Sequence, residues 1–156
     1  MNGGLQLVVF RLDDLRYALY LAAVERVVRV ADITPLPGAP DVVLGVVNVQ
    51  GRIVPVFNTR RRFSLPERDV RLEDEMVLVR TSARTVALLV DSVEGLLRCG
   101  DGDATPADQV WPVTGHVAGV IKRSDGLILI HNLDAFLSAD ERDAMEQALT
   151  AESRVP

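Results

Sequence analysis

Three consecutive arginines, Arg60 to Arg62, follow an apolar, strand-like stretch that begins at Gly45. Such a cluster can bind an anionic substrate, a nucleic-acid backbone or carboxylates of another protein, because each guanidinium offers five N–H donors in a fixed plane. The net charge is −5, and aromatic residues make up 4% of the chain. A nucleic-acid binder needs a dominant basic field and often aromatic stacking platforms, so we expect no nucleic-acid partner.

The residues that most often carry catalysis are sparse. There are two histidines, His116 and His131, and one cysteine, Cys99, and none lies in an H-x-x-x-H or C-x-x-C spacing. His131 ends an apolar strand pattern and is expected to be structural, and Cys99 is expected to be a buried thiol. The sequence also lacks a G-x-S-x-G motif and a Gly-rich loop before a helix. We therefore predict a protein that is not an enzyme and has no metal or cofactor.

Short apolar segments separated by turn residues indicate a mainly β fold. They predict four hairpins, with turns at Asp13-Asp14, Gln50-Gly51, 82–84 and 124–126. Pro55 lies inside one strand pattern, so that strand is expected at a sheet edge or at a bulge. The charged segment 61–75 is expected to be a solvated crossover between two halves.

The C-terminal segment has a helical pattern instead. Ser138 and Glu141 match the S-x-x-E capping box. The apolar residues that follow recur at helical spacing and would form one narrow stripe, made of Ala144, Met145, Ala148 and Leu149. These features predict a helix over 138–150 that packs on the β body.

The chain also resembles itself. Residues 18–29 align without gaps on residues 87–98, and the Val-Glu pairs Val24-Glu25 and Val93-Glu94 coincide. Residues 45–58 then align on 119–132 in the same order. We therefore predict one domain over 1–156 made of two small SH3-like five-stranded β-barrels packed together, with strands crossing between them, repeat copies near 18–63 and 87–137, and short connecting helices. The second copy has Asp134 where the first has Arg60, so the barrel itself does not require the arginines.

Cellular location is inferred from features of the whole chain. No apolar run approaches the roughly 18 residues of a membrane span, and the first residues do not resemble a signal peptide. A single cysteine excludes an internal disulfide and fits a reducing compartment. We expect a cytoplasmic protein with no direct membrane insertion.

The stretch LGVVNVQGRIVPVFNTRRRF, with similar blocks at FRLDDLRYALYLAAVERVVR, ITPLPGAPDVVLG and ALLVDSVEGLL, resembles the CheW-like domain family of bacterial chemotaxis coupling proteins. The resemblance runs from about Leu7 to Leu137. It implies a two-barrel fold and a non-catalytic adaptor. The implied partners are the cytoplasmic tip of methyl-accepting receptors and the regulatory domain of a chemotaxis histidine kinase. It also implies recruitment to membrane-associated receptor arrays.

Residue by residue, the resemblance implies a receptor-binding surface. Its members would be Arg60, Val24, Arg26, Asn48, Gly51 and Gln50, whereas the kinase-binding residues stay unassigned. The chain departs from the family pattern at Gln50, where an arginine is usual, at Asn58, where an aspartate is usual, and at Arg26, where a glutamate is frequent. These departures favour an alternative as well, a divergent adaptor with a non-chemotaxis or polar-localisation partner.

Overall fold

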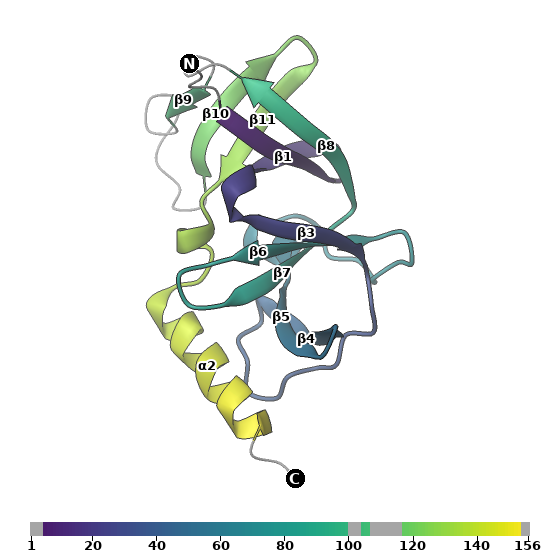
Figure 1. Ribbon diagram of the computed structural model, residues 1–156, viewed down its shortest axis with the longest axis vertical. Coiled ribbons are helices and arrows are strands. Elements are labelled where there is room, and N and C mark those ends of the chain that lie inside the picture. The colour runs from purple at the N-terminus through teal and green to yellow at the C-terminus, as the bar shows by residue number, and fades with distance from the viewer. Residues whose placement is uncertain (1–4, 100–103, 107–116, 154–156) are drawn as a thin grey trace.

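The structure is a computed structural model that describes residues 5–99, 104–106 and 117–153. The fold is mainly β, as predicted. A six-stranded sheet lies above a five-stranded sheet, and a C-terminal helix, α2, runs down the side of the lower sheet (Figure 1). The six-stranded sheet contains β1 (Leu5–Leu12), β2 (Leu15–Tyr20), β8 (Ser92–Cys99), β9 (Ala104–Pro106), β10 (Val117–Arg123) and β11 (Gly126–His131). The five-stranded sheet contains β3 (Val24–Arg29), β4 (Val43–Val49), β5 (Arg52–Phe57), β6 (Glu75–Arg80) and β7 (Thr85–Val90).

Short helices and one longer helix complete the described part. They are η1 (Leu21–Ala23), α1 (Thr59–Arg62), η3 (Leu133–Ala135) and α2 (Ala139–Ser153). Most of the long connection between β8 and β10, with Trp111 and His116, lies outside the described residues. None of the helices in the described ranges combines the length and the hydropathy that crossing a bilayer would require.

The five-stranded sheet is nested inside the six-stranded one along the chain. Its strands come from one continuous segment, 24–90, whereas the six-stranded sheet combines β1 and β2 with strands that follow residue 91. The chain therefore crosses between the sheets twice, at η1 and between β7 and β8. Each sheet contains one parallel pairing, β5 with β7 and β11 with β2.

The strand orders of the two sheets correspond. One order is β3-β6-β7-β5-β4, and five strands of the other run β8-β1-β2-β11-β10. Under this correspondence β2 matches β7, β3 matches β8, and the β4–β5 hairpin matches the β10–β11 hairpin. These are the pairs that the internal sequence alignment brings together. The two copies exchange strands between the sheets. Strand β2 of the first copy lies in the sheet with the β10–β11 hairpin of the second copy, and β7 of the second copy lies in the sheet with the β4–β5 hairpin of the first.

All four predicted hairpins are present as antiparallel pairs. The prediction for Pro55 is wrong in part, because β5 lies inside its sheet and the irregular register is in the partner strand, between Val43 and Gly45. The sheet tolerates Pro55 because the pairing of β5 with β7 covers only Val56 and Phe57. No donor is thus needed from position 55 on that side.

The hydrogen-bonded ladder of the five-stranded sheet is open, with β3 and β4 at its edges. The β4 edge is covered by an isolated bridge between Thr34 and Val46. This close approach requires Gly45, since a Cβ there would lie 2.2 Å from the carbonyl oxygen of Thr34. Covering an edge in this way limits pairing with other chains.

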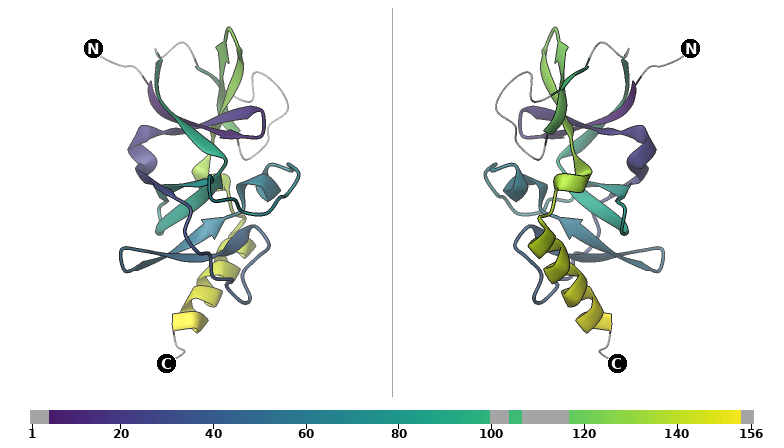
Figure 2. Two further views of the ribbon diagram at one scale, coloured as in Figure 1. Left: turned by 90° about the vertical axis from the view of Figure 1, so that its right-hand side faces the viewer. Right: turned by 90° about the vertical axis from the view of Figure 1, so that its left-hand side faces the viewer.

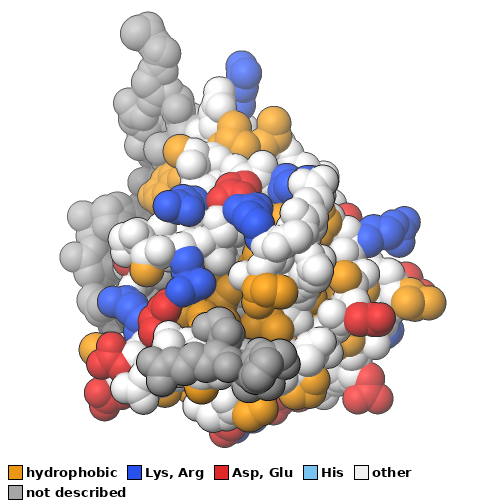
Figure 3. All heavy atoms as spheres, turned by 60° about the horizontal axis from the view of Figure 1, so that its bottom comes forward, with side chains coloured by type: hydrophobic (Ala, Val, Ile, Leu, Met, Phe, Trp, Pro, Cys, Tyr) orange, Lys and Arg blue, Asp and Glu red, His pale blue; other side chains and the backbone are white. Residues whose placement is uncertain are grey.

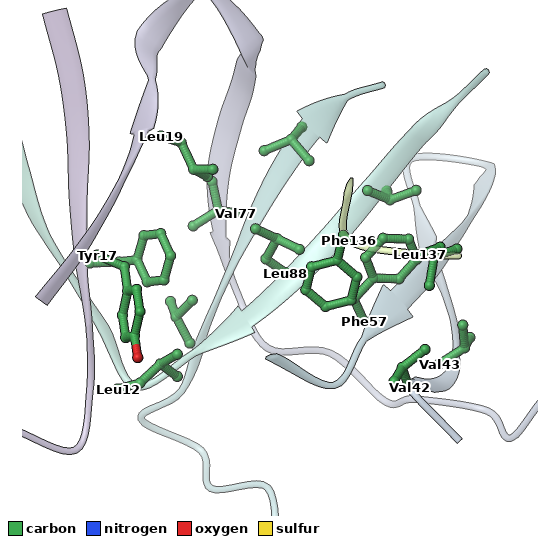
Figure 4. Close-up of a cluster of buried hydrophobic side chains, with 14 of the residues drawn as sticks. Leu12, Tyr17, Leu19, Val42, Val43, Phe57, Val77, Leu88, Phe136 and Leu137 are labelled. Carbon is green, nitrogen blue, oxygen red and sulfur yellow. The ribbon is translucent and has the colours of Figure 1, made fainter. Parts of the chain in front are cut away.

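One buried cluster joins the two sheets and α2 (Figure 4). Phe57 of β5 stacks on Phe136 with ring centroids 4.6 Å apart, and Tyr17 of β2 stacks on Phe63 at 4.5 Å. Leu19 and Val77 come from different sheets and belong to the same cluster. The interface between the barrels is therefore a continuous apolar core, the main source of stabilisation for the pair.

Helix α2 begins at the predicted capping box. The hydroxyl of Ser138 accepts from the N–H of Glu141, and the Glu141 carboxylate accepts from the N–H of Ser138. Met145 and Ala148 are buried, which confirms the predicted apolar stripe. Arg84, in the β6–β7 turn, donates two hydrogen bonds to the Glu146 carboxylate and holds the helix against the five-stranded sheet.

Candidate functional site

The three arginines lie in α1, directly after β5. Asn58 caps the helix, because its side-chain oxygen accepts from the N–H of Arg61. In the left view of Figure 2, α1 lies just below the turn of the β1–β2 hairpin. The helix thus lies beside the boundary between the two sheets, and its side chains can reach both.

Arg60 points into this boundary. Its guanidinium donates to Asp13 in the β1–β2 turn at 2.7 Å, to Asp91 between β7 and β8 at 2.8 Å, and to the carbonyl of Pro66 at 2.8 Å. Its side chain is 10% exposed. With all of these partners inside the chain, Arg60 connects segments of both sheets and presents little surface to another molecule.

Asp91 is the centre of a larger ion network. Arg68 donates to Asp91 at 2.5 Å and to the buried Asp74 at 2.8 Å, and the N–H of Asp13 also donates to Asp91. Burial alone would raise the pKa of Asp91, but hydrogen bonds from Asp13 and Arg60 outweigh it, and the pKa lies below its ordinary value. The prediction of a solvated 61–75 segment is therefore wrong at Arg68 and Asp74, which anchor it.

Arg61 and Arg62 also have partners within the chain. Arg61 is half-exposed and pairs with Asp41 and Glu67. Arg62 pairs with Glu141 at 2.6 Å and lies over the ring of Phe136, so it links α1 to the start of α2. The cluster that the sequence presents as one basic patch is thus divided among different partners. Its first and third arginines are mostly buried.

The other five predicted site residues lie around the opposite end of the five-stranded sheet. Val24 and Arg26 belong to the start of β3, and Asn48, Gln50 and Gly51 belong to the β4–β5 turn. Gln50 and Gly51 adopt positive φ angles of 51° and 87°, and the Asn48 side chain accepts from the N–H of Gly51 at 2.8 Å. The structure places these five at one end of the sheet, two on the β3 edge and three at the β4–β5 turn, and it separates Arg60 from them by the length of β5.

A contact that the sequence reasoning missed joins the two parts of this surface. Glu25 accepts from Arg52 at 3.1 Å and from the hydroxyl of Thr85. The hydrogen bond from Thr85, followed by that from Arg52, lowers the pKa of Glu25. Glu25 thereby holds the start of β3 beside the starts of β5 and β7. The repeated Val-Glu pair in the sequence could have indicated that Glu25 forms an ion pair within the chain. The glutamate of the second copy, Glu94, also forms one, with Arg11 at 2.7 Å.

His131 and Cys99, the two described residues that were considered for catalysis, are buried in the protein. His131 is buried and contacts the rings of Phe63 and Phe136 edge-on, as expected for a structural histidine, and Cys99 is buried as well. Within the ranges that the structure describes, no group of three or more His, Cys, Asp or Glu side chains is arranged to hold a metal ion.

The sequence is similar to those of a known domain family and of several characterised proteins. The CheW-like domain profile matches residues 6–141. The chain is 28% identical to the chemotaxis protein CheW of Rhizobium meliloti over 145 residues, which cover 92% of this chain and 94% of the relative. It is 26% identical to the chemotaxis protein CheW of Treponema pallidum over 142 residues, which cover 87% and 84%.

A solved structure agrees with these matches. The crystal structure of the scaffolding protein TtCheW from Thermoanaerobacter tengcongensis superimposes with a TM-score of 0.80 at 27% identity, covering 88% of this chain and 94% of that one. The arrangement of the two sheets is thus shared in three dimensions over most of both chains. The chain belongs to the CheW-like domain family.

Proposed function

We propose that this protein is a non-catalytic adaptor that couples methyl-accepting chemotaxis receptors to a chemotaxis histidine kinase. The observation that carries the proposal is the family match over residues 6–141, supported by relatives named as chemotaxis proteins and a solved structure named as a scaffolding protein. The protein acts in the cytoplasm and is recruited to receptor arrays. Its work is to hold two partners at a fixed distance, which suits a rigid double-barrel body.

The receptor-binding surface in this proposal is the end of the five-stranded sheet that carries Val24, Arg26, Asn48, Gln50 and Gly51. Support comes from the convergence of these residues on one end of the sheet and from the ion pair between Glu25 and Arg52 beside them. Arg60 acts on this surface as a positioning residue. It fixes the relative placement of the two sheets through Asp13 and Asp91.

A reconstitution experiment tests the proposal. The purified chain is mixed with the cytoplasmic hairpin tip of a receptor and the regulatory domain of a chemotaxis kinase, both from its own host, and complexes are followed by sedimentation velocity. We expect both pairwise complexes and a ternary complex. If the chain binds neither component, the adaptor function is wrong, and a divergent adaptor with another partner replaces it.

A further inference from the structure

Three arginines gather at the end of the five-stranded sheet that holds the proposed receptor surface. Arg26 is near the start of β3, Arg52 begins β5, and Arg80 ends β6. Strands β3 and β5 run parallel to β7, and β6 runs antiparallel to it, so these positions lie at one end of the sheet. All three arginines are exposed. We call this group, with Glu25 among it, the basic mouth.

The strand register sets how the basic mouth is oriented. Arg26 lies opposite Leu78, and Arg80 is two residues beyond Leu78 on the same strand. Diagonal neighbours of this kind are about 7–8 Å apart, within reach of two long side chains. Leu78 packs into the core of the barrel. Since alternate residues share a face, Arg26 and Arg80 continue the inward-facing row at the rim of the barrel.

The charges of the basic mouth are not balanced within the described part of the chain. Glu25 accepts from Arg52, and Arg80 is close enough to contribute to the lowered pKa of Glu25. Neither Arg26 nor Arg80 forms an ion pair among the residues that the structure describes. Three positive groups therefore lie around Glu25, and the other carboxylate near them is Asp134, which lines the same pocket as Arg80 without forming an ion pair with it.

The matching end of the six-stranded sheet differs. There Arg16 pairs with Asp125 at 2.7 Å and Arg11 pairs with Glu94. The internal alignment places Gly51 at the position of Asp125, so the five-stranded sheet has no acid at that position. Arg123 ends β10 at this end as well, so three arginines lie near Glu94 and Asp125; the difference is that two of them form ion pairs, whereas Arg26 and Arg80 form none among the described residues.

Exposed apolar side chains lie on the other face of the same strands. The side chain of Ile53, one residue after Arg52, is 56% exposed, and Val27, one residue after Arg26, is 36% exposed, and both point away from the face that carries Arg26 and Arg52, because successive strand residues point to opposite faces. Figure 3, which turns the bottom of the molecule forward, shows Lys and Arg side chains spread over the view with acidic and hydrophobic side chains among them. A partner that covers the rim of the five-stranded sheet therefore meets the arginines and has to supply carboxylates.

We propose that the basic mouth binds an acidic segment of the receptor, in which at least two carboxylates pair with Arg26 and Arg80. The inference rests on the proposed adaptor function, since it assigns the chemistry of the receptor face that docks there. Guanidinium groups pair with carboxylates in bidentate geometry and gain strength as water is excluded. A nucleic acid fits less well, because the acidic chain as a whole repels phosphate.

Binding of the receptor tip, measured by calorimetry at 50 and 300 mM NaCl, tests this inference. The variants are the double reversal Arg26→Glu/Arg80→Glu, its neutral counterpart Arg26→Gln/Arg80→Gln, and the control Arg29→Glu at the other end of β3. We expect roughly a hundredfold loss for the reversal, roughly tenfold for the neutral pair, and less than threefold for the control. Wild-type affinity should fall as salt rises.

The outcomes separate the two proposals. If the wild type binds the receptor tip and the double reversal binds it equally well, the basic mouth is not the docking site, and the adaptor function still stands. If the wild type binds neither the receptor tip nor the kinase domain, the adaptor function itself is wrong. If the reversal removes binding of the kinase domain or of a 20-nucleotide DNA and not of the receptor, the assigned partner is wrong. Reversal of receptor carboxylates to arginine should restore binding to the double reversal.

Discussion

Asp91 accepts hydrogen bonds from two guanidinium groups and one backbone N–H at the point where the chain passes from one sheet to the other. The Asp91 side chain is only 18% exposed, so its negative charge depends on these donors for much of its stabilisation. Removing one arginine leaves a charge that neither water nor the remaining partner fully compensates. Truncation of Arg60 is therefore expected to destabilise the fold, although Arg60 lies at the end of the five-stranded sheet opposite the basic mouth.

Replacing Arg60 by alanine should lower the free energy of unfolding by about 3 kcal/mol, because it uncouples Asp13 and Asp91 from α1. Urea denaturation followed by circular dichroism measures this. Arg61→Ala is the matched control, since its side chain is 44% exposed and its pairs are at the surface, and it should cost no more than about 0.5 kcal/mol. Equal midpoints for both variants would contradict a structural role for Arg60.

Stability should also depend on pH through this network. The pKa values of Asp74 and Asp91 are lowered in the folded protein by their arginine and backbone partners, which outweigh the effect of burial. A lowered folded-state pKa contributes stability above the unfolded value near 4, and that contribution disappears as pH falls through the folded value. Thermal midpoints measured from pH 6 to pH 2 should fall most steeply below pH 4. The fall should be shallower in Asp91→Asn, and an identical slope in that variant would argue against the network.

At the scale of single elements, Thr34 lies so close to β4 that it limits which residue fits at position 45 on that edge of the sheet. Gly45→Ala would place a Cβ 2.2 Å from the Thr34 carbonyl oxygen, so the bridge to Val46 must open. We expect a loss of about 2 kcal/mol or more and faster amide exchange at Thr34 and Val46. Gly51→Ala is the comparison, because its Cβ would meet open space and it bears only the strain of φ +87°, about 1 kcal/mol. A smaller effect at position 45 than at position 51 would contradict this reading.

Elements whose partners are near in sequence could be predicted, and contacts between distant elements could not. The hairpins follow from turn residues such as Gln50-Gly51, and α2 follows from the Ser138–Glu141 capping box. No short turn joins β5 to β7, so their parallel pairing leaves no signal in the sequence. For that reason β5 was not expected inside the sheet, and Pro55 was expected at an edge or a bulge. Likewise the arginines of α1 read as a surface patch, because Asp13, Asp91 and Glu141 are distant in the chain and close only after folding.

At the scale of the whole molecule, the shared core makes the two barrels one thermodynamic unit. Phe10 and Leu19 of one sheet, Val77 and Leu88 of the other, and Phe136 belong to the same buried cluster. Separating the sheets would expose all of it, so neither barrel has an independent stability comparable to that of the pair. Calorimetry should show a single transition with equal calorimetric and van't Hoff enthalpies, and two resolved transitions would contradict this.

The nesting of one sheet inside the other also has a consequence during synthesis on the ribosome. The five-stranded sheet is complete once residue 90 has emerged, but β2 waits for its parallel partner β11, which ends at His131. More than a hundred residues separate β2 from the end of β11, so at the rate of bacterial translation the first hairpin stays without that neighbour for on the order of ten seconds. During that interval its apolar side chains, such as Leu7 and Phe10, which are buried in the complete fold, are accessible to chaperones. The order of emergence therefore favours folding of the five-stranded sheet first, with the six-stranded sheet completed against it.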